Sequence, residues 1–145
     1  MIGRAELMAL IPHQGAMCLL DRVVAWDESS IHAASGTHRD ASHPLRHGAR
    51  LAALHLCEYG AQAMAIHGGL LAAAQGGRAR PGLLVSLRAV ELACDDLQHC
   101  EGELDVHARV LHSDGAGWQY EFHVEHRGVR LAQGRAAVML QGEGT

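Results

Sequence analysis

Apolar residues lie on nearly every side of one long segment of the chain, residues 51–74. This segment contains no proline and many strong helix formers, chiefly alanine and leucine. A helix that is apolar all round is typical of a buried position, because a surface helix keeps one polar face toward water. We therefore expect a buried helix over 51–74, ended by the glycines at 76 and 77.

In the second half of the chain, apolar and polar residues alternate, which is the period of a strand with one buried face. The clearest run is 118–125, where aromatic and branched side chains alternate with polar ones. Shorter runs of the same kind occupy 83–87, 104–110, 129–131 and 136–140. Glycines in the intervening segments 114–117 and 127–128 predict hairpin turns.

The N-terminal third gives a weaker pattern. We expect a short helix near 4–10, a strand over 17–26 and its hairpin partner over 30–37. The polar segment 37–50 contains Pro44 and Gly48 and predicts a loop. These patterns favour a single α+β domain over 1–145, in which an antiparallel sheet of five or six strands wraps around one long central helix.

The composition narrows the classes of function. The 145 residues suit one domain with a hydrophobic core of its own. A net charge of −4 and 3% aromatic residues argue against a nucleic-acid-binding protein, which would carry a basic face or stacking aromatic residues. No apolar run approaches the roughly 20 residues of a membrane span, and the N-terminus lacks signal-peptide features, so we expect a cytoplasmic protein. The four cysteines form no CxxC motif and are expected to be free thiols.

Glu58 is the single acid in the apolar segment 51–74. A buried carboxylate without a partner is costly, so such a group is normally paired or exposed. Gln62 lies four residues on and His55 three residues back, so the three share one stripe of a helix. Either Glu58 sits near an exposed edge of the helix or caps a neighbouring element, or it is held by Gln62 and faces a cleft as a general acid–base.

Histidines in the loop before the helix could supply the second half of an acid–base pair. His38, His43 and His47 all lie in this loop, and histidine is a base near neutral pH. The amides at the start of the helix could hold the oxyanion that forms when a thioester loses its α-proton. Each histidine taken singly is also compatible with a solvated loop position.

Histidines are as frequent in this chain as arginines, at twelve each, and no lysine occurs. His43 and His47 have the i, i+4 spacing of a helical metal pair, but Pro44 lies between them and no HExxH or Cys/His cluster accompanies them. We therefore expect no metal ion and no cofactor. Most of the histidines are expected to lie on polar strand faces or in loops.

Two blocks of the sequence resemble a known family. Residues 11–14 (IPHQ) and 19–23 (LLDRV) are similar to the LPHR…LLVDRV opening of hotdog-fold 3-hydroxyacyl-[acyl-carrier-protein] dehydratases. Residues 58–65 (EYGAQAMA) resemble the EAMAQ stretch of the central helix in these enzymes. The resemblance is nearer still to the dehydratase-like hotdog proteins of aryl polyene biosynthesis clusters, whose helix is much like EYxAQAMAxHGGL.

The resemblance implies a hotdog fold and a dimer, with either a second copy or another hotdog subunit, and active sites at the dimer interface. It also implies elimination of water from a 3-hydroxyacyl thioester carried on acyl carrier protein. A loop histidine of one subunit would take the α-proton, and the helix glutamate of the other would assist departure of the β-hydroxyl. Glu58 and Gln62 match the glutamate and glutamine of the family.

The catalytic histidine of the family has two candidates in this chain. Counting back from Glu58 places it next to His43, whereas aligning the loop proline of the family with Pro44 places it near His47. His47 is slightly favoured, because Gly48 and the start of the helix follow it directly.

The substrate-binding backbone of the family is matched less closely. Its Pro-Gly dipeptides are missing here, and Ala53 stands where the helix of the family starts with a glycine that lets the backbone approach the thioester. The resemblance makes Gly48, Ala53 and Gln62 the candidate substrate-binding residues.

Two other functions fit the same residues. The departures in the loop are compatible with a non-catalytic or half-catalytic subunit that is stable or active only with a second hotdog protein. A thioesterase is also compatible, because the same fold can use a carboxylate to direct water at the acyl carbon.

Overall fold

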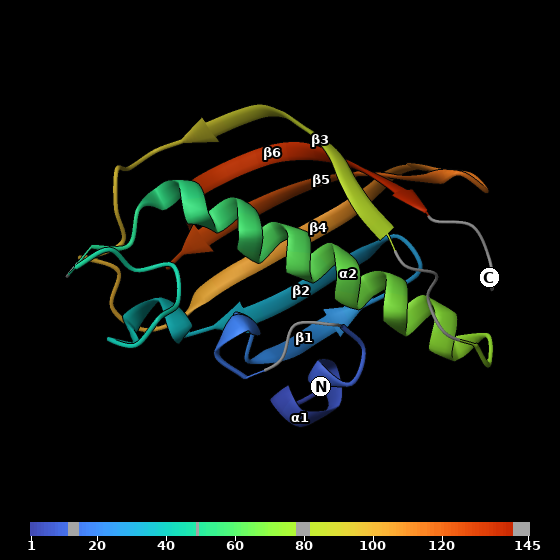
Figure 1. Cartoon of the computed structure of the whole chain (residues 1–145), viewed down its shortest axis with the longest axis horizontal. Coiled ribbons are helices and arrows are strands. Elements are labelled where there is room, and N and C mark those ends of the chain that lie inside the picture. The colour runs from blue at the N-terminus through green and yellow to red at the C-terminus, as the bar shows by residue number, and fades with distance from the viewer. Residues whose placement is uncertain (12–14, 49, 78–81, 141–145) are drawn as a thin grey trace.

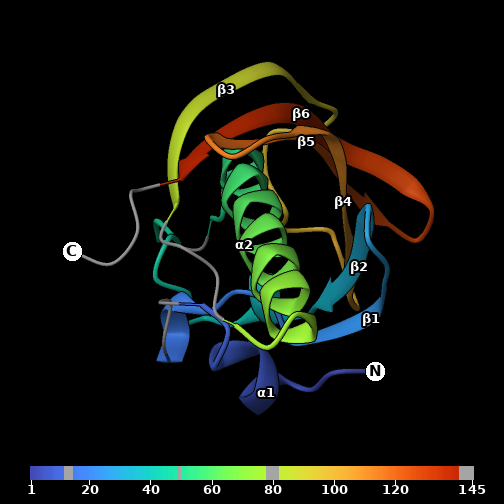
Figure 2. The ribbon, with the colours of Figure 1, turned by 90° about the vertical axis from the view of Figure 1, so that its right-hand side faces the viewer.

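The computed structural model describes residues 1–11, 15–48, 50–77 and 82–140. Within these residues, six antiparallel strands form one sheet in the order β1-β2-β4-β5-β6-β3. The main elements are α1 (Arg4–Met8), β1 (Arg22–Trp26), β2 (Ser30–Ser35), α2 (Leu56–Ala74), β3 (Gly82–Leu92), β4 (Leu104–Ser113), β5 (Gly117–His126) and β6 (Val129–Leu140). The sheet curves around α2, as Figures 1 and 2 show, so the predicted architecture is confirmed.

Strand alternation decides which residues meet the helix. On β4 and β5 the even-numbered residues from Leu104 to Ala108 and from Tyr120 to Val124 are buried, while their odd-numbered neighbours are more exposed. The buried set faces α2, whose own buried residues include Tyr59, Ala63 and Ile66. The core therefore lies between the concave face of the sheet and the helix.

The single phenylalanine of the chain fixes how closely α2 approaches the sheet. Phe122 lies on β5 between two glycines, Gly60 of α2 and Gly134 of β6. A Cβ atom added at Gly60 would lie 2.5 Å from the Phe122 ring, and one added at Gly134 would lie 2.9 Å from it. The ring thus occupies the space that side chains at these positions would need.

Substitution of Gly60 by alanine is expected to destabilise the fold, because the new methyl group would overlap a fully packed ring. Overpacking of this kind costs about 1–3 kcal/mol, which outweighs the helix propensity that alanine contributes. Gly68→Ala in the same helix is the matched control, since an added Cβ meets nothing within 4 Å there. Urea unfolding of both variants checks this, and a Gly60→Ala variant as stable as Gly68→Ala would contradict the packing described.

The expected strand over 17–26 begins only at Arg22, which corrects the sequence prediction. Cys18, Leu19 and Leu20 are fully buried, so the apolar pattern correctly predicted burial but not a strand. Their backbone groups, however, bond to side chains from other segments. The Leu19 N–H donates to Gln62, and Arg4 donates to the carbonyls of Cys18 and Leu20.

The long helix begins at Leu56 and not at residue 51, after a 3₁₀ turn over Ala53–His55. The reason is backbone pairing with the loop before β4. The Ala53 N–H donates to the Asp95 carbonyl at 2.8 Å, and the Leu97 N–H donates to the Leu51 carbonyl at 3.0 Å. These bonds hold the first residues in an extended conformation. In the part of the chain that the structure describes, no helix is long and apolar enough to cross a membrane.

Candidate active site on the central helix

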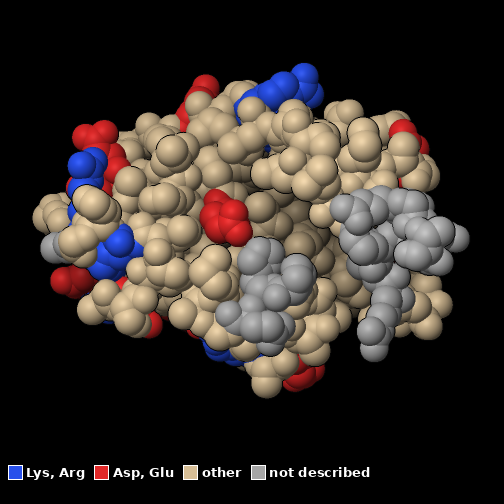
Figure 3. Space-filling model, viewed as in Figure 1, with Lys and Arg blue, Asp and Glu red and all other residues tan. Residues whose placement is uncertain are grey.

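Glu58 lies in the first turn of α2, on the less buried side of the helix. The residues that follow it on this side at helical spacing are small: Ala61, Ala65, Gly68 and Ala72. Figure 3 shows the face of the molecule formed over α2, on which charged side chains are few away from the rim. The N-terminal end of a helix also favours a negative charge. The acid therefore stands at one end of a row of small side chains on the less buried side of the helix.

Gln62 is fully buried and holds the segment before β1 against α2. Its Oε1 accepts the Leu19 N–H at 2.8 Å, and its Nε2 donates to the Met17 carbonyl at 2.8 Å. The same Nε2 lies 3.4 Å from Glu58 Oε1, which is a weak bond of the kind that the helix spacing predicted. All of these bonds are made within the chain. The Gln62 side chain therefore positions Leu19, Met17 and Glu58.

Tyr59, which adjoins Glu58, ties the loop before the helix to the same segment. Its hydroxyl lies 2.9 Å from His43 Nε2 and 2.8 Å from Thr37 Oγ1, and Thr37 Oγ1 donates to the Leu19 carbonyl at 2.7 Å. Since a carbonyl only accepts, the bonds run from His43 through Tyr59 and Thr37 to Leu19. Burial raises the pKa of Tyr59 to about 12, so this hydroxyl keeps its proton at neutral pH.

His43 is buried, and both of its ring nitrogens are occupied. Nδ1 accepts the Leu45 N–H at 3.1 Å, so the neutral ring carries its hydrogen on Nε2, which donates to Tyr59. Burial lowers the pKa of His43, and the nearby charge of Arg46 lowers it further. His43 is therefore a neutral structural link in this arrangement, with neither nitrogen open to a substrate.

His47 and Gly48 lie at the exposed tip of the same loop. The His47 N–H donates to the Arg50 carbonyl at 2.8 Å, and the Arg50 N–H donates to the His47 carbonyl at 3.1 Å. Gly48 has a φ of +63°, a conformation that glycine adopts without strain. The two candidate histidines thus differ in environment, one inside the protein and one at its surface.

The start of the helix offers less to an oxyanion than the sequence suggested. Ala53 is buried, and its N–H donates to the Asp95 carbonyl. That amide is consequently occupied in this arrangement. An oxyanion at this end of the helix would need a donor other than the Ala53 N–H.

The structure brings Glu58 and Gln62 together, whereas His47 and Gly48 lie apart at the loop tip. His43 is connected to Gln62 only indirectly, through the hydrogen bonds of Tyr59, Thr37 and Leu19. Sequence reasoning missed the part played by Tyr59. A tyrosine hydroxyl in a buried, apolar helix needs a hydrogen-bond partner. That requirement was the feature of the sequence that could have indicated the role of Tyr59. Residues 12–14 of the N-terminal block lie outside the described residues.

Two further buried histidines stabilise the fold in their neutral form. His67 Nε2 donates to the Asp27 carbonyl at 2.8 Å, and its Nδ1 accepts from the Tyr120 hydroxyl at 2.8 Å. His38 Nε2 donates to the Cys100 carbonyl at 2.6 Å. Burial lowers the pKa of both rings, so each resists protonation in the folded chain.

These buried histidines predict a loss of stability in mild acid. Above the ordinary histidine pKa of about 6.5, the rings are neutral in both states and the stability is complete. As the pH falls below that value, the unfolded chain takes up protons that the folded chain resists, so the free energy of unfolding decreases. Urea unfolding at pH 7.5 and 5.5 should show this, with a smaller decrease for His67→Gln. His112→Gln, at an exposed position, should keep the wild-type decrease, and an unchanged pH dependence in His67→Gln would contradict the assignment.

Comparison with known proteins gives one family. The model of the ApeP-like family, described as ApeP dehydratase, matches residues 5–143. A comparison with curated proteins found no significant match. The family match confirms the resemblance that the sequence blocks indicated.

Several solved structures share the fold. A chain of the dehydratase heterocomplex ApeI:P from Xenorhabdus doucetiae is 21% identical, with a TM-score of 0.85 over 94% of this chain and 91% of that one. A putative thioesterase from Silicibacter sp. TM1040 is 12% identical, with a TM-score of 0.66 over 97% and 93% of the two chains. A conserved protein from Pseudomonas aeruginosa is 18% identical, with a TM-score of 0.58 over 82% and 86%. These likenesses confirm the hotdog fold.

Proposed function

The chain belongs to the ApeP-like dehydratase family, and from that premise we propose that it removes water from 3-hydroxyacyl thioesters carried on acyl carrier protein, with Glu58 as a catalytic residue. The family match over residues 5–143 is the observation that carries the proposal. The chain assembly served would be of the fatty-acid or aryl polyene type. A cytoplasmic location is part of this proposal.

Elimination needs a base and an acid on the two carbons next to the thioester. The base takes the proton from Cα, the electron pair of that C–H bond forms the Cα–Cβ double bond, and the β-hydroxyl leaves as water once the acid protonates it. A carboxyl group can serve this second role when its pKa lies near the working pH and it is close to the hydroxyl. Glu58 meets the positional requirement, because it stands beside the small residues that leave room for an acyl chain.

The proposed base is a loop histidine. Both nitrogens of His43 bond within the chain, which leaves the exposed His47 as the better candidate in this sequence. In the arrangement that the family implies, this histidine would act on a substrate held at the Glu58 of a second subunit. A related subunit that brings its own histidine to Glu58 is the half-catalytic alternative.

A second hotdog subunit is proposed because one edge of the sheet is apolar and unpaired in the described chain. Strand β3 lies at this edge and exposes Leu83, Leu84, Val85, Leu87 and Leu92. An exposed apolar edge strand is a template for pairing with another chain. The similar Xenorhabdus protein is part of a heterocomplex, which supports a partner of the same fold.

The function is tested by incubating the purified chain, alone and with a co-expressed hotdog partner, with a 3-hydroxyacyl carrier protein. Mass spectrometry should detect the trans-2-enoyl product, and a thiol reagent should detect no release of free carrier thiol. Thiol release without the enoyl product would support a thioesterase instead. The variant His47→Asn in the same assay shows which chain supplies the base, since unchanged activity would assign that role to the partner.

A further inference from the structure

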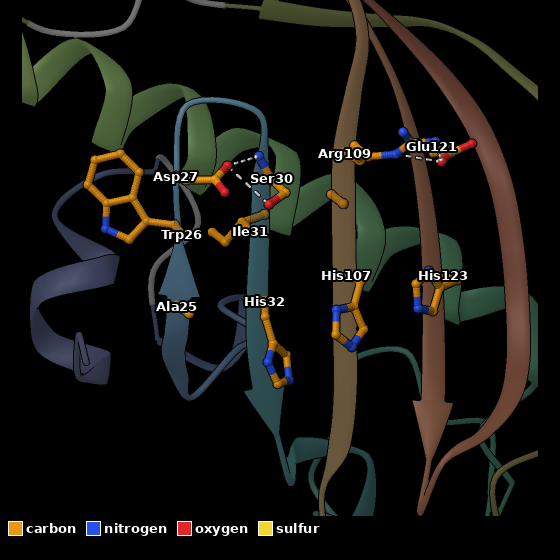
Figure 4. A pocket seen from close by; sticks show the side chains of 11 residues that line it. Ala25, Trp26, Asp27, Ser30, Ile31, His32, His107, Arg109, Glu121 and His123 are labelled. Carbon is orange, nitrogen blue, oxygen red and sulfur yellow. Dashed lines mark hydrogen bonds and ion pairs between the residues drawn. The ribbon is translucent and has the colours of Figure 1, made fainter.

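Three histidines form a row on the face of the sheet that points away from α2. His32 on β2 pairs directly with His107 on β4, and His107 pairs directly with His123 on β5. Figure 4 shows the three rings side by side across the neighbouring strands, with the helix behind the sheet. The ring centroids are 4.2 Å and 4.5 Å apart, and the rings are nearly parallel.

Carboxylates lie next to this row, two residues along the strands. Asp105 and Glu125 face one another across β4 and β5. Asp105 Oδ1 is 2.7 Å from His32 Nε2, so Asp105 serves the outer end of the row. Glu125 lies close to both of the other rings, with Oε1 at 3.2 Å from His123 Nε2 and Oε2 at 4.0 Å from His107 Nε2.

We propose that His107, His123 and Glu125 bind a divalent transition-metal ion of the Zn²⁺ class. Their ligand atoms all lie within 4.8 Å of one another. Zinc bonds of about 2.0–2.1 Å in a tetrahedral arrangement place neighbouring ligand atoms about 3.3 Å apart. The distance from Glu125 to His123 has this value already. His107 Nε2 lies 4.0 Å from Glu125, and the His107 and His123 rings have to turn out of their parallel stacking so that both lone pairs point at one ion.

The donor set suits such an ion. Two imidazole nitrogens and one carboxylate oxygen are common ligands of Zn²⁺, which completes its coordination with water. Burial is the main cause that lowers the pKa of His107 and of His123, so both rings offer a lone pair at neutral pH. The histidine row also borders an open hollow of about 300 Å³, which lies on the Arg109 and Glu121 side of the row, away from Glu125.

The strand register places all three ligand residues on one face of the sheet without any loop. His107 and His123 are directly opposite on hydrogen-bonded strands, and Glu125 follows His123 by two residues on the same face. On the other side of the row, Arg109 is paired with Glu121. A bound ion would therefore link β4 to β5 on the outer face, remote from Glu58 on the helix side.

The test is a Zn²⁺ titration of the full chain, in the oligomeric state in which it is isolated, after removal of metal with a chelator. Calorimetry should detect Zn²⁺ binding, and the melting temperature of the protein should rise as the Zn²⁺ concentration increases. His107→Asn, His123→Asn and Glu125→Gln should each weaken that binding by at least about tenfold, because even the loss of an outer-shell partner costs this much. His32→Asn is the matched control and should bind as the wild type does, since its Nε2 is engaged with Asp105.

Binding that is unchanged in all three ligand variants would overturn the proposal, and so would an equal loss in His32→Asn. Circular dichroism should confirm that each variant is folded. Co²⁺ gives a second measurement, because a spectrum without a sulfur-to-cobalt charge-transfer band separates this site from the four cysteines. A spectrum that does contain the sulfur-to-cobalt band would contradict the assignment to His107, His123 and Glu125.

Discussion

Replacing Glu58 with glutamine is expected to abolish dehydration while leaving the fold intact. The amide has nearly the same shape as the carboxyl group, but it cannot protonate the departing β-hydroxyl. Loss of a general acid lowers the rate by about 10²–10⁴-fold. The side chain is only half-buried and lies beside small residues, so the substitution should not disturb the core. The rate of enoyl thioester formation, measured against the concentration of folded protein, checks this expectation.

A matched control is available at Glu28, an exposed acid in the turn between β1 and β2. Glu28→Gln changes the net charge by the same amount and should keep the wild-type rate. If both variants kept it, Glu58 would be a structural acid and the proposed mechanism would be wrong. Equal melting temperatures of the two variants are needed for the comparison.

Replacing Gln62 with leucine is expected to give the largest loss of stability of the variants considered. The leucine fills a similar volume, but the Leu19 N–H and the Met17 carbonyl lose their partners. Each polar group left without its hydrogen bond away from water costs about 1–3 kcal/mol, so losing both bonds should lower the free energy of unfolding by about 2–6 kcal/mol. Urea unfolding at neutral pH measures this change.

Gln119→Leu is the matched control, because Gln119 is exposed on β5. It should change the free energy of unfolding by less than about 0.5 kcal/mol. A Gln62→Leu variant that unfolds like this control would show that the segment before β1 is held in another way. The Glu58→Gln variant should resemble the control as well, which separates the two neighbouring helix residues by their effects.

The central helix and the strands of the second half could be predicted because their patterns are local. Alternation over 118–125 and 104–110 reports directly on which side chains face the core. Glu58 stood out for the same reason, as the one acid in an apolar helix. The bond from Gln62 to Glu58 followed from the spacing of four residues.

The segment before β1 could not be predicted in the same way. Its apolar residues suggested a strand, but its backbone is held by Gln62 and Arg4, which are distant in sequence. The two sequence blocks of the family resemblance turn out to contact each other there, since Gln62 bonds to Met17 and Leu19. Periodicity carries no information about such long-range side-chain bonds.

The histidine row shows a similar limit. The sequence predicted that most of the histidines lie on polar strand faces or in loops, and His107 and His123 do lie on the less buried face of their strands. Only the register of β2, β4 and β5 places them opposite each other and beside Glu125. The expectation that the chain has no metal site rested on the loop pair His43 and His47 and on the lack of an HExxH or Cys/His motif, whereas a cross-strand pair of ligands leaves no such spacing in the sequence.

Glu58 and Gln62 lie one turn apart on α2 but have different roles, and a single side-by-side comparison distinguishes them. Enoyl thioester formed per folded chain should be determined side by side for the wild type, Glu58→Gln and Gln62→Leu, together with the folded fraction of each. Glu58→Gln should be fully folded and inactive, whereas Gln62→Leu should lose folded protein first. An active Glu58→Gln variant, or a Gln62→Leu variant as stable as the wild type, would contradict these roles.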